Sequence, residues 1–250
     1  MIKLSEISPK APKEFEKEAI KEQTKELVEK ISELQNLLYA EKKHSVLIVL
    51  QGMDGSGKDS TTRALFQKCS PVGVQVTAFK KPTEEEFAHD FLWRAHKVAP
   101  EKGMIRVFNR SHYEDILIQY VRGWIDDEKR ERRMKSINVF EETLQYDGNT
   151  SVIKFFMYMS PEEQLKQLTE RIEEPNKYWK HNDDDWEERK LWDKYMKAYE
   201  YVLNSSTIPW TILPCDQEWY RNYVAAKTIC ETLESLKMKL PALTSVLFKK

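Results

Sequence analysis

The chain has 250 residues, of which 40 are basic and 41 acidic, for a formal net charge of -1. This balance excludes a global field that would draw the protein to nucleic acid or to a membrane surface, so a polyanionic ligand must meet a local basic surface. The length suits one domain with a single core and a small insertion, and it argues against two independent domains.

Three widely spaced cysteines, Cys69, Cys215 and Cys230, form no C-x-x-C pair. This number and spacing argue against a disulfide framework or a zinc site and favour a reducing compartment, with the cysteines as small buried residues. No N-terminal stretch is typical of a signal peptide, and no apolar run approaches the roughly 20 residues that span a bilayer. We therefore expect a soluble, cytoplasmic protein that binds neither nucleic acid nor membranes.

Residues 14 to 40 are predicted to form a leading helix within an N-terminal helical extension of about 1–44. Its apolar side chains recur at spacings of three and four, at Leu27, Ile31, Leu34 and Leu38. Five short apolar runs follow, with helical stretches between them. They predict strands over residues 46–50, 74–79, 105–108, 152–157 and 210–213. This alternation is typical of an α/β fold with a parallel sheet covered on both faces and ligands at the carboxyl ends of the strands.

A glycine-rich segment directly follows the first predicted strand and is typical of a phosphate-binding loop, or P-loop, that enters a helix. The glycines let backbone N–H groups line a concave nest for anionic oxygens, and the helix start adds its positive dipole. Lys58 supplies a mobile charge to the transferred phosphate. The usual motif places Ser or Thr after this lysine, but here the residue is Asp59. The predicted phosphate-binding residues of the loop are Gly52, Gly55, Ser56, Gly57, Lys58, Asp59 and Ser60.

The third predicted strand is followed by Asn109, where P-loop kinases usually place a carboxylate that binds magnesium. Without that acid, the carboxylates that flank the phosphate nest, Asp54 and Asp59, are the candidate ligands of a hard cation. Mg²⁺ is the expected ion, with Mn²⁺ as a possible substitute. Asp54 has the alternative role of bracing the loop through backbone amides. Asp59 has the alternative explanation that acids are favoured in any first helical turn.

A helix is predicted to begin at the end of the third strand, and it places Arg110 and Glu114 one turn apart on the side that faces the site. Arg110 is suited to hold phosphate bidentately, while Glu114 is suited to contact the acceptor or a metal. The alternative is an ion pair within the helix. His112 is a candidate phosphorylated nucleophile, but a packing role is favoured because in-line transfer between phosphates needs no covalent intermediate. The predicted buried side is Tyr113, Ile116, Leu117, Tyr120 and Val121.

Several other basic residues are candidates for binding a long polyanion. Arg94 and Lys97 are three residues apart and are predicted to share a helical face. The run Lys129-Arg130-Glu131-Arg132-Arg133-Met134-Lys135 is strongly basic for so neutral a protein. Such a run is usually a solvated helix face, which is the alternative interpretation. The remaining members of the candidate track are Lys80, Lys81 and Arg122.

Residues between the fourth and fifth strands are predicted to form a lid. A helix starts at Ser160 and ends near Pro175, the polar and aromatic residues 176–185 are predicted to be a loop, and a helix resumes at Trp192. Two helices joined by a charged loop, with the insertion at about 170–192, would exclude water from phosphoryl transfer. Arg171 and Lys180 are its candidate phosphate-binding residues. A closing helix is predicted from residue 217 to 236.

The sequence contains six separate motifs in this order: Gly52 to Asp59, Phe79-Lys80-Lys81-Pro82, His89 to Arg94, Phe108 to Asp115, Asn176 to Lys180 and Trp219-Tyr220-Arg221-Asn222. Together they resemble the motifs of the polyphosphate kinase 2 family. The likeness spans roughly residues 30–237, and the Asn-Arg-Ser-His-Tyr-Glu form at 109–114 is similar to the subgroup that phosphorylates both AMP and ADP. Ser56 and Ser60 stand where relatives often have Ala and Gly.

The resemblance implies a P-loop kinase-like three-layer sandwich with about five parallel strands and a helical lid, in one domain that covers residues 1–250. It also implies reversible, Mg²⁺-dependent transfer of the terminal phosphoryl group of inorganic polyphosphate to ADP or AMP by a homo-oligomer, a dimer or a tetramer. By matching position, Asp54 is the metal-binding or acceptor-orienting acid, Lys58 the phosphate lysine and Arg110 a phosphate clamp. Glu114 matches the position associated with acceptor choice, and the lid basics Arg171 and Lys180 close over the transfer.

Two other functions are weighed against this one. An ATP-dependent kinase of nucleotides or another small molecule would differ in its donor. The basic track favours a polymeric donor, and the missing hydroxyl at Asp59 disfavours a standard site for ATP with Mg²⁺. A non-catalytic nucleotide-binding switch is disfavoured because the base-reading motif N-K-x-D is absent: Tyr178 and Trp179 follow Asn176-Lys177.

Overall fold

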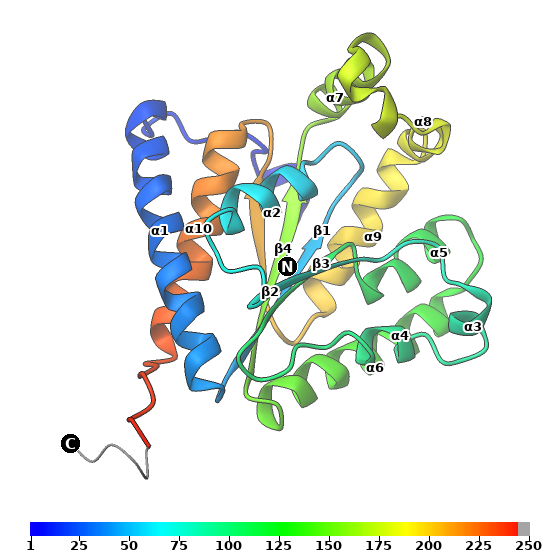
Figure 1. Cartoon of the computed structure of the whole chain (residues 1–250). Coiled ribbons are helices and arrows are strands. Elements are labelled where there is room, and N and C mark those ends of the chain that lie inside the picture. Colours follow the sequence, from blue (N-terminus) through cyan, green and yellow to red (C-terminus); the bar gives the residue numbers. More distant parts are fainter. Residues whose placement is uncertain (245–250) are drawn as a thin grey trace.

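Five parallel strands form the centre of the molecule, as the apolar runs predict (Figure 1). The computed structural model describes residues 1–244. Each strand overlaps its predicted run, and the order across the sheet is β2-β3-β1-β4-β5. The strands are β1 (Ser45–Gln51), β2 (Val74–Ala78), β3 (Ile105–Asn109), β4 (Thr150–Tyr158) and β5 (Trp210–Pro214).

The central strand β1 places the phosphate loop beside the end of β3. β1 pairs with β3 on one side and with β4 on the other. In this register Leu50 lies opposite Asn109, and the backbone N–H of Arg110 donates to the carbonyl of Leu50 at 3.0 Å. The segments that follow β1 and β3 therefore leave the sheet side by side.

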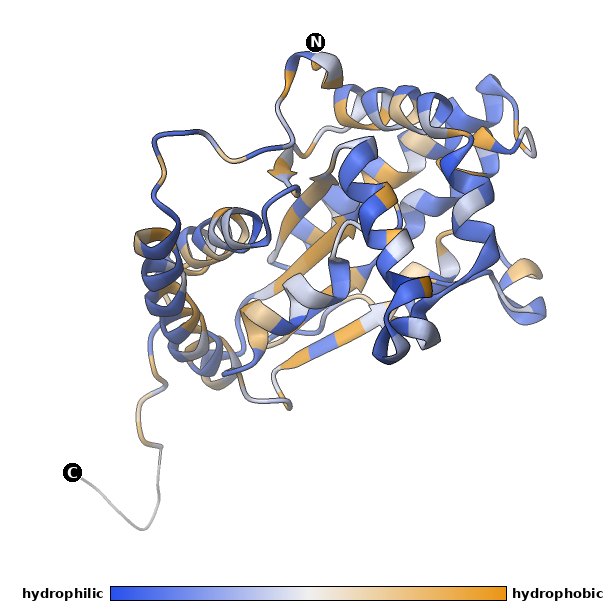
Figure 2. Ribbon diagram, turned by 90° about the horizontal axis from the view of Figure 1, so that it is seen from above, coloured by the Kyte–Doolittle hydropathy of each residue, from blue (hydrophilic) through white to orange (hydrophobic). Residues whose placement is uncertain are grey.

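Helices cover both faces of the sheet, because alternate strand residues point to opposite sides. Leu47 and Val49 of β1 pack in one cluster, while Val46, Ile48 and Leu50 pack in the other. The strands are the most hydrophobic ribbons of the molecule in Figure 2. This arrangement confirms the predicted three-layer sandwich. One layer contains α1 (Lys17–Glu41), α2 (Lys58–Phe66) and α10 (Glu218–Ser235), and the other α5 (Ile118–Val121), α6 (Asp127–Tyr146) and α9 (Trp192–Ser205).

The leading helix α1 belongs to the first of these layers. It packs against α10, and Ile31 and Leu38 of the predicted stripe are fully buried in the core beneath it. Residues before α1 cross to the other face of the sheet. There a short 3-10 turn, η1 (Leu4–Glu6), inserts Leu4 into the cluster that contains Leu47 and Val49. The Tyr158 hydroxyl donates to the carbonyl of Leu4 at 3.0 Å. The first 41 residues thus brace both sides of the sheet.

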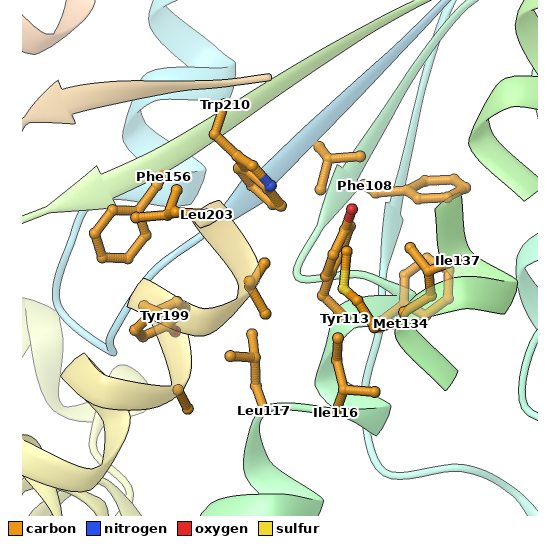
Figure 3. Packing of buried hydrophobic residues seen from close by; sticks show 14 of the residues in the cluster. Phe108, Tyr113, Ile116, Leu117, Met134, Ile137, Phe156, Tyr199, Leu203 and Trp210 are labelled. Carbon is orange, nitrogen blue, oxygen red and sulfur yellow. The ribbon is translucent and has the colours of Figure 1, made fainter. Parts of the chain in front are cut away.

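The predicted helix after β3 is wrong in its continuity. A 3-10 turn, η2 (His112–Asp115), is followed by the single turn of α5, and Arg110 lies outside both. The helical backbone is interrupted at Ile116 and Leu117. This interruption lets the side chains of these two residues reach the core, where they are 0% and 1% exposed. Tyr113 of η2 is buried among them (Figure 3).

The predicted loop over residues 176–185 is also wrong in part. The lid region contains α7 (Pro161–Glu173), the 3-10 helix η3 (Pro175–Lys180) and α8 (Asp183–Arg189), and it projects beyond the carboxyl ends of the strands (Figure 1). Asn182 caps α8 by accepting from the N–H of Asp184 at 3.2 Å. Three successive acids then favour the positive end of the helix. The helix α7 matches the predicted one, whereas η3 and α8 are too short to produce apolar periodicity.

The remaining short helices, α3 (Glu84–Phe87) and α4 (Trp93–His96), follow β2. All three cysteines are free, and Cys215 and Cys230 are buried as predicted. Burial raises the pKa of the Cys215 thiol to about 12, so this side chain is unreactive. Over residues 1–244, no helix combines the length and the apolar character that crossing a bilayer requires.

Replacing a buried residue of α1 tests whether this helix belongs to the core. Ile31→Ala should lower the free energy of unfolding by about 2–5 kcal/mol, because it leaves a cavity between α1 and the sheet. The exposed Glu33→Ala on the same helix should change it by about 0.5 kcal/mol or less. Chemical denaturation measures both. A loss below about 1 kcal/mol for Ile31→Ala would show that α1 is only loosely attached.

Candidate active site

A cavity of about 600 Å³ lies at the carboxyl ends of the central strands. Its floor is the start of the phosphate loop, and its walls come from the segments after β2 and β3, from α5 and from α8 and α9. This volume is within the range of small-molecule sites. Eight of the sequence-predicted site residues line it: Gly52, Asp54, Lys80, Lys81, Arg94, Arg110, Glu114 and Arg122.

The phosphate loop is closed by its own lysine. The Lys58 ammonium donates to the carbonyls of Gly52 at 2.9 Å and Met53 at 3.1 Å, so it spans the loop. Burial lowers the pKa of Lys58, and the nearby Asp54 carboxylate opposes this effect. Gly57 has φ of 87°, a left-handed conformation that a glycine adopts without strain. The loop therefore places a positive charge next to a left-handed turn that glycine accommodates.

Arg221 of α10 covers the loop from behind and was missed by sequence reasoning as a site residue. Its guanidinium donates to the carbonyl of Ser56 at 3.2 Å and to the Ser60 hydroxyl at 3.0 Å. A side chain at Gly57 would place its Cβ 2.3 Å from the Arg221 Nη1. The sequence signal that could have identified Arg221 is its spacing of four from Ala225, which places it on the buried stripe of α10.

An ion pair joins the phosphate loop to the segment after β3. Arg110 has φ of 56°, and this left-handed turn directs its guanidinium to Asp54, where Nη2 donates to Oδ1 at 2.5 Å. Burial raises the pKa of the Asp54 carboxyl, but the charges of Lys58 and Arg110 outweigh this effect and hold the pKa below its usual value. Arg110 thus pairs with Asp54, and the predicted alternative of a pair with Glu114 within one helix does not occur.

Glu114 lies on the same segment as Arg110 and lines the same cavity. Its carboxylate accepts a hydrogen bond from the Gln51 side-chain amide, while the Ser111 hydroxyl donates to Gln51 Oε1 at 3.1 Å. Burial raises the pKa of Glu114, although the charge of Arg110 opposes this effect. The cavity thus contains two carboxylates with pKa values shifted in opposite directions, Asp54 downward and Glu114 upward. Such divergence is frequent at functional sites.

The two positions that depart from the usual phosphate-loop motif contact each other. The side-chain amide of Asn109 at the end of β3 donates to the carboxylate of Asp59 in the first turn of α2. The common arrangement has a hydroxyl on the helix and a carboxylate at the strand end. Here the acid is on the helix and the neutral partner is on the strand.

One carboxylate of the cavity is suited to bind a magnesium ion. Within residues 1–244, no three His, Cys, Asp or Glu side chains gather into a group that would hold a metal by themselves. Mg²⁺ in phosphate-transfer sites takes only one or two carboxylates and completes its shell with substrate oxygens and water. Asp54 lines the cavity and is a quarter exposed, so its carboxylate fits this requirement.

The outer cations of the predicted track already have protein partners. Arg94 is buried, and it donates to Asp115 at 2.8 Å and to the carbonyl of Lys80 at 2.9 Å. Lys97 is exposed, and its ammonium lies 4.0 Å from the ring centroid of Trp93, so Arg94 and Lys97 differ in burial and in partners.

The basic run at 129–135 lies on α6, where acids one turn away neutralise part of it. Arg132 pairs with Glu128 at 2.6 Å, and Lys135 pairs with Glu131 at 2.7 Å. Arg130 pairs with Asp127 at 2.7 Å and also lies over the ring of Tyr120, 3.8 Å from its centroid. These contacts favour the alternative of a solvated helix face.

Arg171 of the lid and Arg122, which directly follows α5, also pair with acids of α8. Arg171 donates to Asp185 at 2.5 Å, and Arg122 donates through Nε to Glu188 at 2.9 Å. Burial and the charge of Asp54 raise the pKa of Asp185, while Arg171 opposes this shift. The Lys180 ammonium lies over the ring of Trp179. Neither Arg171 nor Lys180 lines the cavity, so the structure does not bring these two lid residues to the other predicted site residues.

Comparison with known proteins gives a consistent set of relatives. The model of the family "Polyphosphate kinase 2 (PPK2)" matches residues 14–241, so the match begins earlier than the predicted residue 30. An AMP/ADP-polyphosphate phosphotransferase of Meiothermus ruber is 42% identical over 228 residues, which cover 90% of this chain and 85% of the relative. An ADP-polyphosphate phosphotransferase of Rhodopseudomonas palustris is 41% identical over 232 residues, 87% of this chain and 80% of the relative. The crystal structure of polyphosphate kinase 2 from Arthrobacter aurescens has a TM-score of 0.93 and 36% identity, with coverage of 98% of this chain and 90% of that one.

Alanine substitutions at two glycines with positive φ distinguish the cost of backbone strain from the cost of a steric clash. Gly57→Ala should lower the free energy of unfolding more than Gly123→Ala does, by about 1 kcal/mol or more, because only the Cβ at 57 meets Arg221. Gly123 has φ of 72° with nothing within 4 Å of a Cβ, so it reports the strain alone. Thermal and chemical denaturation measure the difference. Equal losses would mean that Arg221 does not pack on the loop as described.

Proposed function

The chain belongs to the polyphosphate kinase 2 family, and we propose that it transfers the terminal phosphoryl group of inorganic polyphosphate to AMP or ADP, reversibly and with Mg²⁺. The observation that carries this proposal is the ion pair of Asp54 with Arg110 at the floor of a cavity of nucleotide size, with the charge of the buried Lys58 acting on Asp54. The names of the two relatives described above support the choice of donor and acceptors.

In this proposal the phosphate loop and two cations stabilise the charge of the transferring group. Phosphoryl transfer requires little covalent chemistry from the protein, so positioning and electrostatics supply most of the catalysis. Lys58 and Arg110 both contact the loop, Lys58 through the Gly52 carbonyl and Arg110 through the Asp54 carboxylate. Backbone N–H groups of Gly55 to Lys58 hold the non-transferring oxygens, and Asp59 with Ser60 begins the helix behind them.

We place the nucleotide acceptor in the cavity. Aromatic side chains of its outer wall, Phe87 and Trp124, are 63% and 68% exposed and offer faces on which a base can stack. Lys80, Lys81 and Arg122 line the same wall and supply positive charge. Glu114 lies between this wall and the loop, where it is suited to orient the acceptor. Arg94 supports the wall through Asp115.

Asp54 would hold Mg²⁺ together with phosphate oxygens and water, and Asp59 is the second candidate. The bound ion would supply positive charge to the transferring phosphate. The lid residues Arg171 and Lys180 would approach the donor only if the lid moves, since neither lines the cavity here. By family resemblance we also expect a cytoplasmic homo-oligomer that binds no nucleic acid, and Mn²⁺ as a substitute ion.

Incubation of the protein with long-chain polyphosphate, Mg²⁺ and either AMP or ADP tests the donor. We expect ADP and ATP to form, and Lys58→Ala should lower kcat by at least about 100-fold because the loop loses its mobile charge. Lys68→Ala, an exposed lysine beyond the end of α2, is the matched control and should retain activity. Absence of product, together with rapid reaction of ATP with a nucleoside monophosphate, would favour the ATP-dependent alternative.

The role of Asp54 in metal binding has a separate test. Asp54→Asn keeps the shape of the side chain but removes its charge, so the Mg²⁺ concentration for half-maximal rate should rise by about tenfold or more. The exposed Asp147→Asn at the end of α6 should leave this concentration unchanged. An Asp54→Asn variant with lower kcat but an unchanged Mg²⁺ requirement would assign the carboxylate to Arg110 alone.

A further inference from the structure

A buried ionic cluster lies beneath the segment that carries Arg110 and Glu114. Lys154 is in the middle of β4 among apolar neighbours, Glu141 is on α6 and His112 is in η2, and each is at most 1% exposed. None of the three lines the cavity. Burying such charges is costly unless they are paired, and apolar residues of similar volume would fill the space at least as well. The proposed catalytic chemistry does not use this cluster.

The cluster anchors two consecutive residues of η2. The Lys154 ammonium donates to Glu141 Oε2 at 2.6 Å and to the Tyr113 hydroxyl at 2.8 Å. His112 Nε2 lies 3.3 Å from Glu141 Oε1, and because a carboxylate only accepts, the ring donates there. Burial raises the pKa of Glu141, but its bonds to His112 and Lys154 outweigh this effect, so the carboxylate stays ionised at neutral pH. Lys154 of β4 and Glu141 of α6 thus hold η2 in place through charge-assisted hydrogen bonds.

The anchored residues lie between the two side chains that face the cavity. Arg110 has a left-handed backbone, a conformation that non-glycine residues keep only when their surroundings hold it. Ser111 secures the start of the segment through Gln51. His112 and Tyr113 secure its middle from the side opposite the cavity. A shift of η2 would therefore move Arg110 and Glu114 together.

We propose that His112, Glu141 and Lys154 are positioning residues, which fix η2 so that Arg110 and Glu114 meet the reacting phosphates in the required geometry. What they position depends on the proposed function, whereas the anchoring itself does not. Misplacement of catalytic groups by about 1 Å lowers rates by about 100-fold, so a modest loosening has a large effect.

Two substitutions at His112 separate the hydrogen bond from packing. His112→Phe keeps an aromatic ring against Phe108 and Phe140 and leaves the Glu141–Lys154 pair intact, but it removes the donor to Glu141. His112→Gln restores a donor at about the place of Nε2. We expect kcat to fall about tenfold or more in His112→Phe, with a smaller change in KM for polyphosphate, and to recover at least in part in His112→Gln.

His96→Phe is the matched control, because His96 also packs edge-on against Phe140 but is exposed and is not bonded to Glu141. Its kcat should equal that of the wild type. Amide hydrogen exchange of residues 110–117 gives a readout that needs no activity: it should accelerate in His112→Phe and not in His112→Gln or His96→Phe. Wild-type kcat and wild-type exchange in a folded His112→Phe variant would overturn the proposal. If the wild type lacks polyphosphate activity, the exchange result still decides the anchoring, and only the proposed function fails.

Discussion

The ion pair between Asp54 and Arg110 connects the two segments on which the site depends. Parallel pairing of β1 with β3 makes the pair possible, since Leu50 and Asn109 lie opposite each other and both chains leave the sheet at the same level. The left-handed turn at Arg110 then directs the guanidinium back to the loop. The charge of the loop and the pKa values of Asp54 and Glu114 all depend on this junction. A phosphotransferase needs such fixed charges because electrostatic stabilisation costs no reorganisation when they are already in place.

Around this junction the molecule uses hydrogen bonds to restrict each functional side chain. Lys58 and Arg221 brace the loop from its two sides, Gln51 holds Glu114, and acids of α8 hold Arg122 and Arg171. The lid arginine is therefore neutralised by Asp185 in this conformation. A phosphate that recruits Arg171 must compete with that carboxylate, which sets a threshold for lid engagement.

The fold was predictable because its strands are distinct apolar runs and several of its longer helices carry clear apolar stripes. All five strands, α1, α9 and α10 follow these signals. The short elements were not predictable in the same way. η2, η3 and α8 last one or two turns, and their form depends on caps such as Ser111 and Asn182 and on which side chains reach the core. The phosphate loop was evident from glycine spacing, whereas the buried partners Arg221, Glu141 and Lys154 interrupt apolar patterns and acquire meaning only from tertiary contacts.

The contact between Asp59 and Asn109 constrains how this loop can change. Replacing Asn109 by the common strand-end acid would set two carboxylates against each other, and one of them would have to take up a proton or move away. Replacing Asp59 by the common hydroxyl residue would leave an amide at the strand end and no acid at either position. A change at either position alone removes the hydrogen bond from the Asn109 amide to the Asp59 carboxylate, and the double exchange would place a hydroxyl on the helix and an acid at the strand end. The two side chains are in contact, so we expect that the effects of substituting them do not add.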